Sequence, residues 1–189
     1  MLARDTLTAL FRDLVRDAMA TQQVLSSETT EFYLVQLLTA FARPNQSDLL
    51  ERPLGVDYLE ACHLPASQQF ERLKRVADTA LFVTGVFVDS LERSLVGPEY
   101  YAALGRTAYA RLSTTPPRAT LADMFRELAG RFPEFARVLA EISEHEIFRR
   151  EQDTVRIYKR WLRTGGAHEA DMLMRRGLSP FSPPTNQKH

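Results

Sequence analysis

The stretch from Arg72 to Leu95, RLKRVADTALFVTGVFVDSLERSL, constrains the fold more than any other part of the chain. It is the longest nearly apolar run, and at about 100° per residue its polar positions form one narrow stripe on a largely apolar helix. A buried strand ends after about 4 to 8 residues, and a membrane span carries few charges. The run therefore predicts the mostly buried central helix of a bundle, with a polar stripe of Lys74, Asp78, Gly85, Asp89 and Glu92.

Amphipathic spacing predicts further helices on both sides of this run. Ser26 or Ser27 is placed to cap the second helix, Ser67 the central helix and Thr120 a later one. The predicted helices span roughly residues 3–21, 28–43, 54–62, 67–96, 98–113, 120–130, a segment beginning at Pro133, and 168–176.

The helix that begins at Pro133 has no clear end in the sequence. It either continues past Ile142 and changes its packing partners, or breaks near Gln152 with Asp153 as a new N-cap. No glycine or proline between Glu146 and Asp153 decides between these alternatives.

The fold class predicted from these patterns is all-α. No alternating strand pattern and no repeat of fixed period is present. With 189 residues, 44% of them hydrophobic and 25% charged, the composition fits one soluble globular domain. We predict a single-domain multi-helix bundle of about seven to nine helices over residues 1–178, followed by a flexible tail at residues 179–189 that contains three prolines.

Composition also bears on compartment and partners. The single cysteine, Cys62, cannot form an internal disulfide, and acids and arginines interrupt the apolar positions of the N-terminus, so we expect a cytoplasmic protein without a membrane segment. The net charge is zero, yet residues 1–66 carry 5 basic and 9 acidic side chains while residues 149–189 carry 9 and 4. The basic portion suits nucleic acid or anionic lipid, but pairing with acidic protein surface is the simpler expectation.

Motifs for common chemistry are absent from the sequence. No G-x-G-x-x-G, P-loop or G-x-S-x-G spacing occurs, and one cysteine without paired histidines does not make a zinc site. A carboxylate-bridged metal site in a bundle needs two Glu-x-x-His motifs. Only Glu60 and His63 have that spacing; Glu141 and His145 are one residue further apart. We therefore predict no catalytic residue, no metal and no cofactor, and keep these four residues as the alternative.

Three features are candidates for binding or for acid–base chemistry. The first is the stripe around Asp78, Gly85 and Asp89, whose acids flank a glycine. The second is the segment EYYAALGRTAY, in which Tyr101 and Tyr109 can border one surface, with Gly105 leaving room for a close approach. The third is Glu146, a carboxylate on an otherwise apolar face, which could serve as an acid or base if burial raised its pKa. The commoner explanation is that this face has already left the core at Glu146.

The segments ETTEFYLVQLL, DTALFVTGVFVDSL and EYYAALGRTAY together resemble a group of bacterial, cytoplasmic, all-helical proteins without an assigned activity. The resemblance covers roughly Ser27 to Leu112. It implies a bacterial, soluble, single-domain protein and brings no activity, cofactor or catalytic residue.

The leading hypothesis is a non-catalytic helical protein that binds a partner protein or a small ligand, possibly in a regulatory role, and forms a homo-oligomer, most simply a homodimer. The ligand or partner-binding candidates are Asp78, Gly85, Asp89, Tyr101 and Tyr109. The alternatives are a metal-binding or enzymatic bundle using Glu60, His63, Glu141 and His145, and nucleic-acid binding through the basic C-terminal helices, which the zero net charge disfavours.

Overall fold

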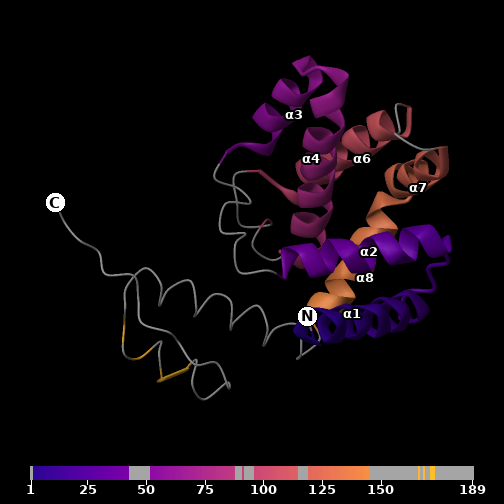
Figure 1. Cartoon of the computed structure of the whole chain (residues 1–189), viewed down its shortest axis with the longest axis vertical. Coiled ribbons are helices and arrows are strands. Elements are labelled where there is room, and N and C mark those ends of the chain that lie inside the picture. Colours follow the sequence, from indigo (N-terminus) through magenta and orange to yellow (C-terminus); the bar gives the residue numbers. More distant parts are fainter. Residues whose placement is uncertain are drawn as a thin grey trace.

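The computed structural model describes residues 2–42, 52–87, 91, 96–114, 119–144, 166, 168 and 171–172. These residues form seven helices and no strand, which confirms the predicted all-α bundle (Figure 1). The helices are α1 (Leu2–Thr21), α2 (Glu28–Phe41), α3 (Leu54–His63), α4 (Ala66–Val86), α6 (Pro98–Thr114), α7 (Ala119–Gly130) and α8 (Phe132–Glu144). None of these helices is long and apolar enough to cross a membrane.

Helix α4 occupies the centre of the bundle, as its composition predicts. It packs against α2, α3, α6 and α8. Every residue from Val76 to Gly85 is buried, including three polar side chains, Asp78, Thr79 and Thr84. Thr84 donates its hydroxyl hydrogen to the carbonyl of Ala80 at 2.7 Å, which satisfies this polar group inside the helix. The C-terminal half of α4 is therefore surrounded by protein.

The central helix is shorter than predicted. We expected it to continue to residue 96, just before Gly97, but α4 ends at Val86, and Phe87 leaves the helical conformation at φ −117° and ψ 26°. The segment before this end, Val83 to Val86, holds two β-branched valines, a threonine and a glycine, all of which favour the helix less than leucine or alanine do. The weak helix propensity of this segment explains the early end.

Two predicted N-caps are also wrong. Helix α4 begins at Ala66 with Pro65 at the cap position, so Ser67 lies inside its first turn, and Thr120 likewise lies inside α7. The carbonyl of Pro65 accepts hydrogen bonds from the backbone N–H groups of Gln68 and Gln69, both at 2.9 Å. The fixed φ of proline suits the start of a helix, and here it sets the boundary without a side-chain cap.

The first two helices form a layer across one end of the molecule, lying side by side in Figure 1. Ser27 caps α2 as predicted, since its hydroxyl oxygen accepts the backbone N–H of Thr30 at 3.2 Å. The Glu127 carboxylate on α7 accepts the hydroxyl hydrogens of Ser27 at 3.1 Å and Thr30 at 2.7 Å. One carboxylate thus joins the start of α2 to α7.

Two glycines allow α4 to lie close to its neighbours. A Cβ atom on Gly85 would lie 2.5 Å from the Cβ of Leu139 and 2.9 Å from the carbonyl oxygen of Ala136, both on α8. On Gly105 of α6 it would lie 2.5 Å from the ring of Phe132 and 2.9 Å from the Cβ of Ala80. Only glycine fits at these distances, so both residues set how closely the helices pack.

Candidate functional site

The polar residue at the middle of α4, Asp78, is the centre of a buried cluster that joins three helices. Lys74 lies one turn before it on the same face of α4, which is the spacing at which opposite charges meet. Tyr33 comes from α2 and Tyr109 from α6. We call these four residues, Tyr33, Lys74, Asp78 and Tyr109, the Asp78 cluster.

Both carboxylate oxygens of Asp78 accept hydrogen bonds. Tyr109 donates its hydroxyl hydrogen to Oδ1 at 2.8 Å, and Tyr33 donates to the same oxygen. Lys74 Nζ donates to Oδ2 at 2.6 Å, as opposite charges four residues apart on a helix can do. Three donors thus replace the water that this side chain loses on burial, two of them neutral and one cationic.

Aromatic rings enclose the Asp78 cluster. The ring of Phe125 lies with its centroid 5.8 Å from that of Tyr33 and 5.9 Å from that of Tyr109. Phe132 lies 6.3 Å from Tyr109, and the Lys74 ammonium group lies 5.0 Å above the ring of Tyr33. Tyr109 is fully buried, whereas 34% of the Lys74 side chain is exposed. Lys74 therefore forms the outer edge of the cluster.

Burial and the neighbouring carboxylate fix the protonation state of the two tyrosines. Burial raises the pKa of Tyr33 well above its ordinary value, and the negative charge of Asp78 raises it further. The pKa of Tyr109 is raised well above its ordinary value for the same two reasons, with burial again the larger. Both phenols are neutral donors at physiological pH. The Asp78 cluster is thus arranged to hold three helices together, and it offers no phenolate for acid–base or nucleophilic chemistry.

The structure brings two of the five predicted binding residues into contact, Asp78 and Tyr109. Gly85 packs against α8 instead of lining a surface. Tyr101 is half-buried and packs edge-on against Tyr100, with ring centroids 5.3 Å apart. Asp89 and Glu146 lie outside the described residues. At Asp78 and Gly85 the predicted polar stripe of α4 therefore faces the interior of the bundle and not solvent.

Tyr33 is the cluster residue that sequence reasoning missed. It lies in the apolar segment EFYLVQLL of α2, whose pattern indicates a core-facing helix and does not single out the Tyr33 hydroxyl. A buried tyrosine needs a hydrogen-bond partner for its hydroxyl, and that requirement was the available signal. The sequence does not say which helix supplies the partner, because Tyr33 and Asp78 are 45 residues apart.

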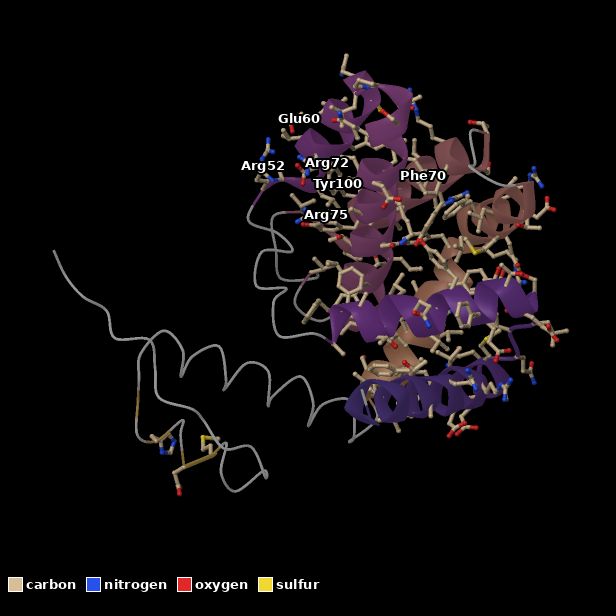
Figure 2. The ribbon with its side chains drawn as sticks, viewed as in Figure 1. Arg52, Glu60, Phe70, Arg72, Arg75 and Tyr100 are labelled. Atoms are coloured by element: carbon tan, nitrogen blue, oxygen red, sulfur yellow. The ribbon has the colours of Figure 1, made fainter. Side chains whose placement is uncertain are left out.

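The residues of the metal-binding alternative have other partners in this structure. Glu60 accepts from Arg52 Nη2 at 2.6 Å and lies 3.9 Å from Arg72, at the edge of α3 and α4 shown in Figure 2. The Nδ1 atom of His63 lies 2.7 Å from the carbonyl oxygen of Leu59. Glu141 accepts from Gln22 at 2.9 Å, and His145 lies outside the described residues. Among the residues that the structure describes, no group of three or more potential metal ligands comes together.

The described residues form two concave surfaces outside the Asp78 cluster. The smaller has a volume of about 290 Å³ between α4, α6 and α8, with Phe132 and Pro133 among its lining residues. This is at the lower limit of about 300 Å³ for small-molecule sites. The larger, which we call the α6–α7 groove, has a volume of about 510 Å³. It is lined by Ala103, Arg106, Thr107, Ala110 and Ser113 of α6 and by Arg126, Ala129 and Gly130 of α7.

The α6–α7 groove is open and combines small side chains with positive charge. Each of its lining residues is exposed or half-buried. Arg106 forms no hydrogen bond or ion pair within the described part of the chain, and Arg126 pairs with its neighbour Asp123, both side chains being largely exposed. An exposed pair of this kind contributes about 1 kcal/mol at most and exchanges readily with another acid. The two guanidinium groups are thus available to an acidic partner.

Comparison of the chain with protein-family models, with curated proteins and with solved structures found no match. The basic C-terminal portion, which the sequence offers as a nucleic-acid-binding alternative, lies outside the described residues apart from Gly166, His168, Asp171 and Met172.

Proposed function

We propose that this protein is a non-catalytic helical bundle that binds a partner protein, and that the partner docks in the α6–α7 groove. The observation that carries the proposal is the groove itself: it is lined by small residues of two adjacent helices and by Arg106, whose guanidinium forms no ion pair within the described residues. Such a surface lets another helix approach closely while an acidic side chain reaches an arginine.

The Asp78 cluster supports the non-catalytic part of the proposal. Each oxygen of Asp78 is already bonded, and both tyrosines are neutral donors whose hydroxyls are directed at the same carboxylate. A general acid or base has to reach a substrate proton directly or through one water molecule. Buried groups that are committed to one another have no such access, so the cluster supports a structural role.

The open shape of the groove favours a protein partner over a small ligand. Small-molecule sites enclose most of their ligand's surface. All five lining residues from α6 share one side of that helix and are accessible from outside, with small side chains at Ala103 and Ala110. A helix laid along this surface covers it without entering an enclosed cavity.

Photo-crosslinking in the cells that produce the protein tests this proposal. A photoreactive side chain at Thr107 in the groove is compared with one at Glu71, which is exposed on α4. Each is combined with Gly130→Leu or with the matched control Gly130→Ala. A Cβ on Gly130 would meet no atom within 4 Å, so alanine leaves the groove open while leucine extends into it.

The expected result is a crosslinked protein that forms from Thr107, persists with Gly130→Ala and disappears with Gly130→Leu. The same products from Thr107 and Glu71, or products that persist with Gly130→Leu, would overturn the proposal. The mass of the crosslinked product, less that of this chain, gives the mass of the partner.

A further inference from the structure

The exposed face of α1 carries a pattern that complements the α6–α7 groove. At about 100° per residue, Ala9, Asp13, Asp17 and Ala20 lie within roughly 80° of the helix circumference. All four are exposed. We call them the α1 stripe: two acids one turn apart, with an alanine before and after them.

The acids of the α1 stripe are available for a new ion pair. Neither Asp13 nor Asp17 forms an ion pair within the residues that the structure describes. Arg16 lies beside the stripe, but it is held by Glu31 of α2 at 2.7 Å. This bond directs the guanidinium of Arg16 towards the second helix of the same chain.

The stripe and the groove also match in length and in the order of their residues. From Ala9 to Ala20 the helix rises about 16 Å, and from Ala103 to Ser113 about 15 Å. In both, small residues lie at the ends and charges near the middle, acidic on α1 and basic on α6 and α7. The chain has zero net charge, so whole molecules do not repel each other.

We propose that the partner in the α6–α7 groove is a second copy of this chain, which inserts its α1 stripe so that Asp13 and Asp17 pair with Arg106 and Arg126. This inference rests on the proposed function and names its partner. Two such contacts related by a two-fold axis form a dimer, while contacts repeated in one direction form a larger assembly. Small side chains on both helices permit the close approach that these short acids need to reach the arginines.

Charge reversal tests the pairing directly. One variant carries Asp13→Arg and Asp17→Arg, and the other carries Arg106→Glu and Arg126→Glu. Sedimentation velocity over a range of protein concentrations gives the mass of each variant relative to the 21.6 kDa chain. We expect the wild type to self-associate and each variant to do so at least about tenfold more weakly, because like charges then face each other across the contact.

An equimolar mixture of the two variants should regain the assembly. The variant with Asp13→Arg and Asp17→Arg has a basic α1 stripe, which fits the acidic groove of the variant with Arg106→Glu and Arg126→Glu. The acidic α1 stripe of the second variant fits the basic groove of the first. Glu71→Arg and Arg75→Glu are matched controls, since both residues are exposed on α4 and lie outside the two surfaces; they should leave the mass unchanged. Gly130→Leu should weaken the assembly and Gly130→Ala should not.

A wild-type chain of monomer mass at every concentration would overturn the inference, as would a mixture that stays monomeric. Circular dichroism and urea unfolding of each variant show whether a loss of assembly reflects a loss of fold. A monomeric chain that still forms a groove-dependent crosslink from Thr107 to a different protein would overturn the self-association and leave the proposed function standing. The absence of any groove-dependent crosslink would overturn both.

Discussion

A carboxylate in the interior of a helical bundle remains an anion only where hydrogen-bond donors replace its lost water. Asp78 has three such donors from three helices, and one of them, Lys74, carries the opposite charge. Because the donors and the acceptor depend on one another, removing one group leaves the others buried without a partner. A substitution at Asp78 should therefore lower the stability of the fold strongly.

Asp78→Ala should lower the free energy of unfolding by about 3 kcal/mol or more, since it leaves two tyrosine hydroxyls without their acceptor and a partly buried ammonium group without its counter-charge. Urea unfolding followed by circular dichroism measures the change. The control is Glu71→Ala, an exposed substitution on the same helix that should alter stability by no more than about 0.5 kcal/mol. Equal effects from the two substitutions would show that the cluster contributes nothing to stability.

The raised pKa values of Tyr33 and Tyr109 predict a loss of stability in alkali. A tyrosine whose pKa is higher in the folded state than in the unfolded chain stabilises the fold fully below the unfolded pKa of about 10. This contribution declines as the pH rises from there through the folded pKa, by up to about 1.4 kcal/mol per pH unit for each tyrosine. Urea unfolding at several pH values above neutrality should show a steeper decline for the wild type than for Tyr33→Phe with Tyr109→Phe. Parallel curves would contradict the assignment.

Among the helices, the features that follow from hydrophobic periodicity could be predicted from the sequence, whereas those that depend on contacts between distant segments could not. The apolar run around Val76 to Gly85 identified the central helix, and Ser27 was one of two predicted caps for α2. The early end at Val86 was missed because a hydrophobic pattern continues beyond it, although the valines and glycine there weaken the helix. For the candidate site, Asp78 and Tyr109 were identified singly, but their contact with each other and with Tyr33 depends on how three helices cross.

Glycine-to-alanine substitutions separate the two kinds of helical glycine in this fold. Gly85→Ala should destabilise the protein by about 1 to 3 kcal/mol, because the new methyl group meets the Ala136 backbone and the Leu139 Cβ at distances that side-chain rotation cannot relieve. Gly130→Ala meets nothing and should be neutral or stabilising by up to about 1 kcal/mol, since alanine favours the helix. Thermal and urea unfolding of both variants measure the difference. Equal effects would show that the close approach of α4 and α8 is not needed for stability.

The molecule as a whole is built around a helix that is buried over its C-terminal half, with less buried helices outside it. Ten consecutive positions of α4, Val76 to Gly85, are buried, whereas α3 buries only Leu54 and Ala61 among its 10 residues. Local opening needs least free energy where few apolar contacts are lost. Stability should therefore differ between the centre and the periphery of the bundle.

Native-state hydrogen exchange measures this difference. The backbone amides of residues 76–85 should exchange only through global unfolding, so their opening free energy should equal that from urea unfolding. The amides of α3 should exchange faster, through local opening. Asp78→Ala should speed exchange in α4 and leave the rates of α3 nearly unchanged. Uniform protection across both helices would contradict a graded organisation.

The groups that meet at Asp78 lie far apart along the chain, so the cluster should form late in folding. Tyr33 precedes Asp78 by 45 residues and Tyr109 follows it by 31, so the cluster forms only after two long loops have closed. Its bonds should therefore be largely absent from the folding transition state, with φ-values of about 0 to 0.3. In stopped-flow experiments Asp78→Ala should then speed unfolding while leaving the folding rate nearly unchanged. The residue at the centre of the bundle thus determines how long the folded state lasts more than how quickly it is reached.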